Sequence, residues 1–350
     1  MAKEGTFTIV NNSIDSPVMV RVLENDGIPR VSWDALVQAS PVSSWFQTPQ
    51  AFAFFDGLSF LEAFAYGVEE EGCLKGVVVG YVQKDGNKLK QFFSRRAIII
   101  GGPLLSEDIS DEELSTLLRT LKDRLGKKTI YLETRNLSDY SKWRVVYEEC
   151  GFVYESHLNF LVNCLPKENL WKNLKENRRR QIKKALAEGV RVEEASSEEE
   201  IRDFYCLLND LYRTRVKTPL FPIDFFLEFY RKNCGKFFLV KDKSEVIGGI
   251  MCPVMDNRVI YELFVCGKDA MFKNKYPSVM ATWAAMDYAA NTNIAMFDFM
   301  GAGKPNEEYG VREFKSKFGG KLVEYGRYRC VSKPFLFAVG KFGVKLMKKT

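Results

Sequence analysis

The sequence predicts an α/β protein that consists of two tandem copies of one folding unit, each built around a mixed central sheet. Three observations lead to this fold class. A chain of 350 residues suits two domains of about 150 residues, strand-like runs alternate with helical stretches throughout, and sequence features recur at a nearly constant offset. With 46% hydrophobic and 27% charged residues, each half can bury a full core.

The repeat consists of four pairs of segments that follow one another in the same order. Offsets between 166 and 169 residues separate the members of each pair: VVVGYV (77–82) and VIGGIM (246–251), AIIIGGP (97–103) and YELFVCGK (261–268), TIYLETRN (129–136) and AMFDFMGAG (295–303), and 147–162 and 315–330. A shared offset of this kind indicates duplication of one unit. We therefore expect a first domain at 1–165, a basic linker helix at 166–189, a second domain at 190–332 and a basic amphipathic tail at 333–350.

Each copy should carry a helix after its central strand, at 109–125 and at 278–292. The first begins with a Ser-capped acidic turn, and the second is almost entirely apolar or small, which predicts deep burial. Segment 166–189 has no interior Pro or Gly and stops at Gly189, so we expect one helix there. Between 167 and 191, nine basic residues stand against three acidic ones, a surplus equal to the net charge of +6 of the whole chain.

Composition excludes several classes of site. His157 is the only histidine, and the eight cysteines include no CxxC pair, so we predict no metal site and no Ser-His-Asp or Cys-His triad. Scattered cysteines are typical of reduced thiols in a cytosolic protein. The first residues do not resemble a signal peptide, and no apolar run approaches the roughly 20 residues that span a bilayer. We therefore expect a cytoplasmic protein.

Two segments resemble one known family. FDFMGAG (297–303), followed by YGVREFKSKFGG (309–320), is similar to the end of the FemAB family, whose members carry a Phe-Lys pair before a Phe-Gly-Gly turn. The segment 178–215 resembles the entry into that family's second domain, and the similarity is clearest over about 176–330. The resemblance implies tandem GNAT-like (acyl-CoA N-acyltransferase-like) domains and transfer of an amino acid from aminoacyl-tRNA to an amine in bacterial cell-envelope synthesis. Members of the wider superfamily use acyl-CoA donors. The long helical hairpin of many tRNA-dependent members is missing here, which weakens the inference to a tRNA donor.

Four residues are candidates for catalysis. By resemblance to the Phe-Lys motif, Lys315 supplies a cation for the oxyanion of an acyl-transfer intermediate, and Phe314 positions the backbone. Asp298 ends a buried strand before a Gly-rich loop, where it could bind the acceptor amine or could satisfy loop N–H groups. Glu262 lies on the central strand of the second copy, where many GNAT enzymes carry a general base. The alternative for Lys315 is a solvated helix face.

Candidates for binding the donor or its phosphates are the cations of the basic helix and of the second copy: Arg178, Arg179, Arg180, Lys183, Lys268, Lys275 and Arg312. The alternative is a lysine-rich linker kept soluble by its charge. The loop before 278 lacks the glycine pattern with which GNAT acetyltransferases hold CoA pyrophosphate at a helix N-terminus, so acetyl-CoA is disfavoured. Candidate pocket residues are Tyr261, Tyr276, Gly301, Gly303 and Tyr309, although each tyrosine could instead be structural.

The tail at 333–350 has a helical face of Phe335, Val339, Phe342 and Leu346 with lysines beside it. It could rest on the inner face of the plasma membrane or pack against its own domain. Taken together, the sequence predicts an acyl- or aminoacyltransferase that modifies an amine of a cell-envelope precursor, either peptidoglycan or a related glycan or lipid. The expected donor is aminoacyl-tRNA or acyl-CoA, without a tightly bound cofactor, and the expected acceptor is lipid- or nucleotide-linked. Two alternatives are a CoA-dependent N-acyltransferase acting on a nucleotide-sugar or lipid amine, and a non-catalytic tandem GNAT module.

Overall fold

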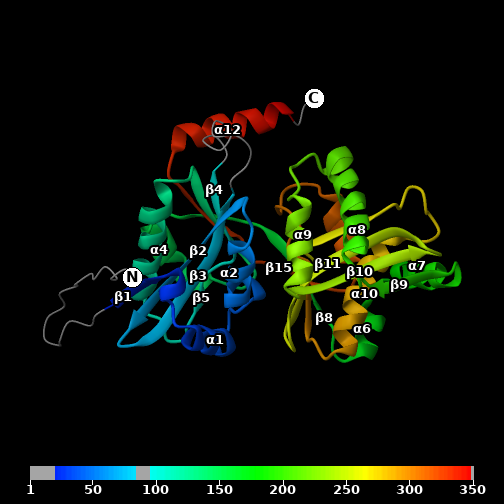
Figure 1. Ribbon diagram of the computed structural model, residues 1–350, viewed down its shortest axis with the longest axis horizontal. Coiled ribbons are helices and arrows are strands. Elements are labelled where there is room, and N and C mark those ends of the chain that lie inside the picture. Colours follow the sequence, from blue (N-terminus) through cyan, green and yellow to red (C-terminus); the bar gives the residue numbers. More distant parts are fainter. Residues whose placement is uncertain (1–19, 84–94, 348–350) are drawn as a thin grey trace, which may run out of the picture. The chain divides into compact units, whose positions relative to one another are not determined.

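Strands and helices alternate along the chain as predicted, and they form two units (Figure 1). The computed structural model describes residues 20–83 and 95–347. Unit 1 comprises residues 1–156 and 325–350, and unit 2 comprises residues 157–324. Each unit has its own buried core.

Unit 1 has a mixed sheet with the strand order β1-β2-β3-β4-β6-β16-β7, with β5 paired to β3. Its strands are β1 Val20–Glu24, β2 Leu61–Glu70, β3 Cys73–Gln83, β4 Arg96–Gly101, β5 Leu104–Leu105, β6 Tyr131–Asn136, β7 Val153–Glu155 and β16 Arg327–Val331. Its helices are α1 Arg30–Ala39, α2 Pro49–Asp56, α4 Asp111–Gly126, α5 Arg144–Glu149 and α12 Pro334–Met347, with 3₁₀ turns at Asn25–Gly27, Trp45–Gln47 and Ser141–Trp143. Only the β4–β6 pair is parallel among the described strands of this sheet.

Unit 2 repeats this topology strand for strand. Its order, β9-β10-β11-β12-β14-β8-β15, has β13 paired to β11 and a parallel β12–β14 pair. Its strands are β8 Leu158–Asn163, β9 Val190–Glu194, β10 Gly235–Asp242, β11 Glu245–Met255, β12 Val259–Tyr261, β13 Phe264–Gly267, β14 Met296–Asp298 and β15 Lys321–Glu324. Its helices are α6 Lys167–Asn173, α7 Glu176–Ala187, α8 Glu198–Leu211, α9 Ile223–Arg231, α10 Pro277–Asn291 and α11 Gly310–Ser316, with a π-helical turn at Tyr212–Val216. The identical order confirms the predicted duplication.

The two predicted helices form because their sequences supply both a cap and an apolar face. Ser110 caps α4 in a reciprocal capping box with Glu113, and leucines at three- and four-residue spacings turn into the core. Helix α10 buries most of its length, as its apolar composition predicts. Both helices pack on the sheet of their own unit.

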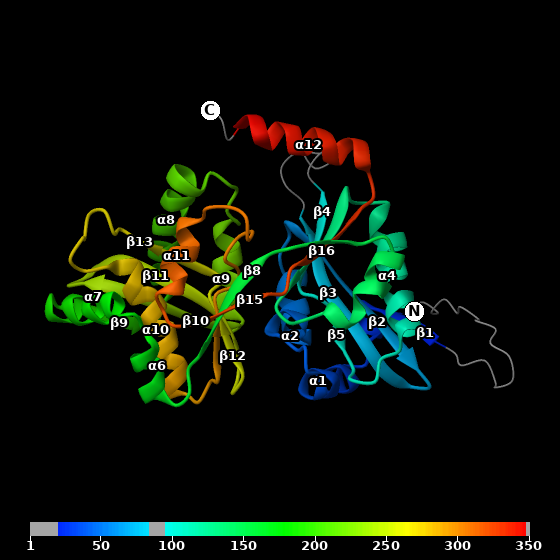
Figure 2. The same ribbon diagram turned by 180° about the vertical axis from the view of Figure 1, so that it is seen from behind.

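The domain boundaries differ from the prediction because the units exchange one strand. Strand β8 comes from the predicted first domain but lies between β14 and β15 in unit 2. Strand β16 comes from the predicted second domain but lies between β6 and β7 in unit 1. Figure 2 labels β8 next to β15, and β16 among the strands of unit 1. Each exchanged strand is buried in the core of the unit that receives it. The boundaries therefore fall at 156/157 and 324/325 rather than at 165 and 332.

The predicted linker helix is also different in the structure. Residues 166–189 form two helices, α6 and α7, which separate at Leu174 and Lys175. Leu170, Leu174 and Ile182 are buried in the core of unit 2, so this segment belongs to that unit and is not a linker. Gly189 ends α7 in a left-handed conformation, as predicted.

The remaining sequence-based expectations concern thiols and membrane spans. The eight cysteines are free thiols, six of them buried. Within residues 20–83 and 95–347, no helix combines the length and apolar character that crossing a membrane requires.

Candidate active site

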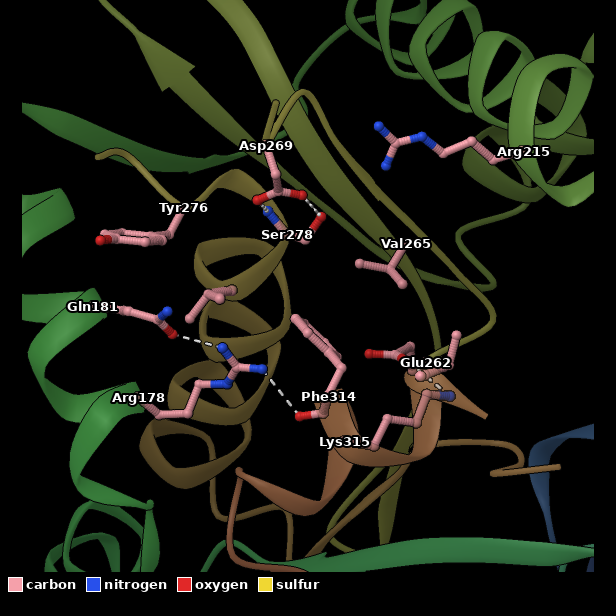
Figure 3. A pocket seen from close by; sticks show the side chains of 13 residues that line it. Arg178, Gln181, Arg215, Glu262, Val265, Asp269, Tyr276, Ser278, Phe314 and Lys315 are labelled. Atoms are coloured by element: carbon pink, nitrogen blue, oxygen red, sulfur yellow. Dashed lines mark hydrogen bonds and ion pairs between the residues drawn. The ribbon is translucent and has the colours of Figure 1, made fainter. Parts of the chain in front are cut away.

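A pocket of about 460 Å³ opens in unit 2. It lies at the point where β11 changes partner, pairing first with β13 and then with β12. Glu262 stands between β12 and β13, and its backbone N–H donates to the backbone carbonyl of Asp298 on β14 (2.9 Å). Four segments supply the walls, which consist of Arg178, Gln181, Arg215, Glu262, Val265, Asp269, Tyr276, Ser278, Val279, Gly310, Val311, Phe314 and Lys315 (Figure 3). All of them belong to unit 2.

A buried ion pair stands in the wall of this pocket. Lys315 Nζ lies 3.1 Å from Glu262 Oε1, and the exposed fractions of the two side chains are 10% and 2%. Thr282 Oγ1 donates to the other carboxylate oxygen of Glu262 (3.1 Å). Burial raises the pKa of Glu262, and the Lys315 ammonium and the Thr282 hydroxyl oppose this rise. The predicted catalytic residues Lys315 and Glu262, which are far apart in sequence, therefore meet in one site.

The ammonium of Lys315 also ties down the Gly-rich loop after β14. Nζ donates to the carbonyls of Phe299 (2.7 Å) and Gly301 (2.9 Å). An ammonium has three N–H groups, so Glu262 and these two carbonyls use all of them. Lys315 is therefore not the solvated residue of the alternative interpretation, and it reaches a ligand oxygen only by exchanging one of these partners.

Arg178 and Phe314 form a second contact in the pocket wall. The Arg178 guanidinium lies over the Phe314 ring, 4.3 Å from its centroid, and also donates to the Phe314 carbonyl (3.1 Å) and to Gln181 (2.6 Å). Arg178 is only 5% exposed, and its Nε has no hydrogen-bond partner. Burial lowers the pKa of Arg178 to about 10. Phe314 thus links this buried cation to Lys315, the next residue along α11 (Figure 3).

Asp298 is buried and does not line the pocket. Its Oδ1 accepts hydrogen bonds from Asn159 Nδ2 (2.8 Å) and from the backbone N–H of Met300 (2.6 Å). Burial raises its pKa to about 6, against the effect of these two donors. These contacts favour the loop-holding interpretation of Asp298, because the loop that it fixes presents the carbonyls bound by Lys315.

Most of the other predicted phosphate-binding cations are engaged elsewhere in unit 2. Lys268 pairs with Glu245 (2.7 Å), Lys275 pairs with Asp242, and Arg312 donates to the carbonyls of the 302–305 loop. Arg179 donates to the Lys172 carbonyl (2.8 Å). Arg180 and Lys183 are exposed. Of the seven predicted cations, the pocket brings in only Arg178.

The predicted pocket residues also lie partly inside and partly outside the lining. Tyr276 lines the pocket, at the N-terminus of α10, whereas Tyr261 is buried on β12 and is not part of the lining. Tyr309 is 45% exposed and packs its ring against Gly303. Gly301 and Gly303 have positive φ values and shape the loop beside Asp298, outside the lining.

Sequence reasoning missed several lining residues, chief among them Arg215, Asp269 and Ser278. Arg215 stands in the π-helical turn that follows α8. Asp269 accepts hydrogen bonds from the backbone N–H (3.2 Å) and the hydroxyl of Ser278, in the first turn of α10. No motif marks these three positions in the sequence.

Comparison with known proteins agrees with this fold. Residues 172–316 match the family model described as an acetyltransferase (GNAT) domain. No curated protein matches the chain. The crystal structure of FemX has a TM-score of 0.68 at 16% identity, covering 90% of this chain and 99% of that one.

Two further solved structures share the tandem arrangement of elements. A domain described as the C-terminal domain of a "putative lysylphosphatidylglycerol synthetase" from Agrobacterium fabrum has a TM-score of 0.57 at 13% identity, with coverages of 88% and 93%. A tandem GNAT protein from the clavulanic acid biosynthesis pathway has a TM-score of 0.54 at 9% identity, with coverages of 89% and 98%. The predicted fold of two tandem GNAT-like domains is confirmed, and it is similar to the fold of FemX. The GNAT domain supports the predicted enzyme class, an acyl- or aminoacyltransferase.

Proposed function

We propose that this protein transfers an aminoacyl or acyl group to an amine of a cell-envelope precursor, and that the chemistry takes place in the pocket of unit 2. The observation that carries the proposal is the buried Glu262–Lys315 pair, which holds a carboxylate and an ammonium 3.1 Å apart beside space for a ligand. The fold shared with FemX and with the lysylphosphatidylglycerol synthetase domain supports an envelope precursor as the acceptor. The acceptor is a lipid- or nucleotide-linked peptidoglycan precursor or a related glycan or lipid.

In the proposed reaction, the acceptor amine attacks the carbonyl carbon of an ester or thioester donor. A C–N bond forms, the C–O or C–S bond breaks, and a proton of the amine passes to the leaving oxygen or sulfur. Glu262 carries this proton, since burial moves its pKa toward neutral pH. Lys315 stabilises the oxyanion by exchanging a loop carbonyl for the substrate oxygen.

Aminoacyl-tRNA is the donor in the leading form of this proposal, and the protein works in the cytoplasm. Arg178 contributes a buried cation without a carboxylate partner among the described residues, which suits a phosphate of the donor. The second candidate is a CoA-dependent N-acyltransferase, which the match to an acetyltransferase domain favours. A non-catalytic tandem module is the third candidate, and it predicts no turnover with either donor.

The test is a transfer assay with the purified full chain. Radiolabelled aminoacyl-tRNA and acetyl-CoA are each offered with UDP-linked and lipid-linked peptidoglycan precursors that carry a free amine. We expect transfer from aminoacyl-tRNA, and a loss of at least 100-fold in Lys315→Met and Glu262→Gln. Lys317→Met is the matched control, because Lys317 lies on the same helix end but pairs with Glu313 (2.7 Å) outside the pocket. Transfer from acetyl-CoA alone would support the second candidate, and full activity in Lys315→Met would remove this site from the reaction.

Helix α12 supports a further part of the proposal, contact with the anionic inner face of the plasma membrane. Phe337 anchors the helix to unit 1 by packing on Tyr131 (5.4 Å between ring centroids), while Phe335 is 79% exposed and Val339 is 47% exposed. Residues 333–350 contain five Lys and no Asp or Glu. Exposed apolar side chains on a basic helix are complementary to an anionic bilayer. The expected contacts of Phe342 and Leu346 lie outside the described side chains.

Sedimentation with lipid vesicles tests this contact. We expect the protein to bind phosphatidylglycerol vesicles and not phosphatidylcholine vesicles, and Phe335→Glu to reduce binding at least fivefold. Val31→Glu is the control, since Val31 is an apolar residue of unit 1 that is 83% exposed on another helix. Equal binding of Phe335→Glu and the wild type would mean that α12 packs against its own domain and does not bind the bilayer.

A further inference from the structure

The position of the Lys315 ammonium depends on the loop that follows β14. Nζ donates to the carbonyls of Phe299 (2.7 Å) and Gly301 (2.9 Å) in addition to its contact with Glu262, so the backbone of this loop directs two of its three N–H groups. If one carbonyl is exchanged for a substrate oxygen, the other must keep Nζ in place. Whatever fixes the loop therefore also fixes the buried ion pair.

The loop is held against β8, the strand that unit 2 receives from the predicted first domain. Two backbone hydrogen bonds join them, from the N–H of Phe299 to the carbonyl of Phe160 (3.1 Å) and from the N–H of Ala302 to the carbonyl of Leu158 (2.6 Å). The two loop N–H groups between these bonds donate to side chains. The middle of the loop is thus fixed by side chains.

Asn159 on β8 holds the middle of the loop from two directions. Its Oδ1 accepts from the backbone N–H of Gly301 (2.7 Å) and from that of Phe160 (2.8 Å). Its Nδ2 donates to Asp298 Oδ1 (2.8 Å), which also accepts from the backbone N–H of Met300 (2.6 Å). Asn159 is only 5% exposed, so water does not readily replace a lost partner.

The contacts of Asn159 require a donor and an acceptor on one short side chain, which an asparagine amide provides. Asp298 needs the donor and the loop N–H needs the acceptor. Burial raises the pKa of Asp298, and the bonds from Asn159 and Met300 oppose this rise; the charges of Lys315 and Glu262 also act on this carboxyl, in opposite senses. Asn159 therefore connects β8 to the charged groups of the site.

We propose that Asn159 is a positioning residue, which holds the backbone of 299–301 so that its carbonyls keep the Lys315 ammonium beside Glu262. This rests on the proposed function, in which Lys315 stabilises the oxyanion. Neither Asn159 nor 299–301 lines the pocket. Loosening the loop should therefore lower kcat and leave KM unchanged, because the ammonium acts in the transition state.

The first measurement follows the loop and Lys315 in the full chain without substrate. Amide hydrogen exchange reports the protection of 299–303, and brief treatment with acetic anhydride followed by mass spectrometry reports the accessibility of Lys315 relative to Lys317, which lies on the same helix end and is 31% exposed. Asn159→Leu keeps a similar volume and removes both kinds of bond. We expect it to lower loop protection at least 10-fold and to raise the relative labelling of Lys315 at least fivefold.

Asn159→Asp gives a readout that a purely structural role would not change. It keeps the acceptor for Gly301 but sets a second carboxylate against Asp298. Two facing carboxylates share one proton, which raises the pKa of the pair, so the bond between them is present at low pH and is lost as the pH rises. Relative to the wild type at the same pH, we expect loop protection and kcat to be near normal at pH 5.5 and at least 10-fold lower at pH 7.5, with KM unchanged.

The same replacements at Asn163 are the matched controls, because Asn163 is an exposed residue of β8 whose side chain accepts from the Leu165 N–H (3.0 Å) outside the pocket. They should leave the loop, the labelling of Lys315 and kcat as in the wild type.

Two results overturn the proposal. One is unchanged loop protection and Lys315 labelling in both Asn159 variants, and the other is a loosened loop with the kcat of the wild type. A failure of the proposed function is distinguishable from both. If the wild type transfers from no donor, the exchange and labelling comparisons still decide whether Asn159 positions the ammonium, and transfer that requires Lys315 would stand even if Asn159→Leu behaved like the wild type.

Discussion

Replacing Lys315 with methionine removes the ammonium beside Glu262 and keeps an unbranched side chain of similar length. In the wild type the two charged atoms are 3.1 Å apart and both side chains are buried. Without Lys315, Glu262 either stays charged without a partner, which costs about 3–5 kcal/mol, or takes up a proton. Starting from its ordinary pKa of 4.5, protonation costs about 1.4 kcal/mol per pH unit, which is about 3.4 kcal/mol at pH 7 and about 0.7 kcal/mol at pH 5.

The variant should therefore lose about 3 kcal/mol of its free energy of unfolding at pH 7, and progressively less toward pH 5. Without Lys315, burial raises the pKa of Glu262 in the folded variant above its value in the unfolded chain, and this difference sets the sign of the pH dependence. The folded variant then binds the proton more tightly, so its stability is greatest at low pH and falls as the pH rises.

Urea unfolding followed by circular dichroism at pH 5, 6, 7 and 8 measures this loss. Lys315→Met is compared with Glu262→Gln and with the double variant, in which no buried carboxylate remains. We expect the double variant to be more stable at pH 7 than the sum of the single losses predicts, by about 2 kcal/mol. A loss below about 1 kcal/mol at pH 7, or an equal loss at pH 5 and pH 7, would refute the reasoning, because Glu262 would not then depend on Lys315.

Three further predictions concern groups outside the pocket. Asp298→Asn should keep both hydrogen bonds to Oδ1 and most of the transfer activity. It should also remove a pH dependence of about 3 kcal/mol from the free energy of unfolding, because a pKa of about 6 makes Asp298 stabilising below pH 4 and this contribution fades as the pH rises to 6. Loss of all activity with normal stability would return Asp298 to a catalytic role. Glu133 is buried, which opposes its ionisation, but three arginines lower its pKa to about 2, so Glu133→Gln should cost about 3 kcal/mol at pH 7 in urea unfolding and the cost should vanish as the pH falls toward 2. A fragment of residues 157–324 should give a cooperative thermal transition by circular dichroism, whereas 166–332 should not, because it lacks β8; equal transitions would contradict the strand exchange.

Much of the fold could be predicted from the sequence because the signals are local. A Ser cap and leucines at helical spacing specify α4 within one segment, and an apolar, uncharged run specifies the buried α10. The repeat offset indicated two equivalent sheets, and their strand orders agree. The prediction of a single linker helix was wrong because Leu174 packs in the core. The helix therefore ends there, although no Pro or Gly marks a break in the sequence.

The site was only partly predictable. The family resemblance led to Lys315, and the expectation of a carboxylate on the central strand led to Glu262, which in the structure lies between β12 and β13. Neither signal showed that the two side chains bond to each other. The charge of the basic segment predicted the same phosphate-binding role for Arg178, Arg179 and Arg180. Successive residues on a helix point in different directions, so Arg178 alone is buried in the pocket wall. Asp269 carries no sequence signal of its own, since an acid in a loop is usually solvated.

The sequence by itself determined that there are two copies of one α/β unit, that strand and helix segments alternate along each copy, and which side chains are apolar enough to form the cores. Only the tertiary structure decided that β8 and β16 change places and that Glu262, Lys315, Arg178 and Asp269 surround one pocket. The physical reason is that an alternating apolar pattern states which face of a strand is buried but not in which sheet. Two similar strands fit either sheet by that criterion, and the chain path through three dimensions makes the choice.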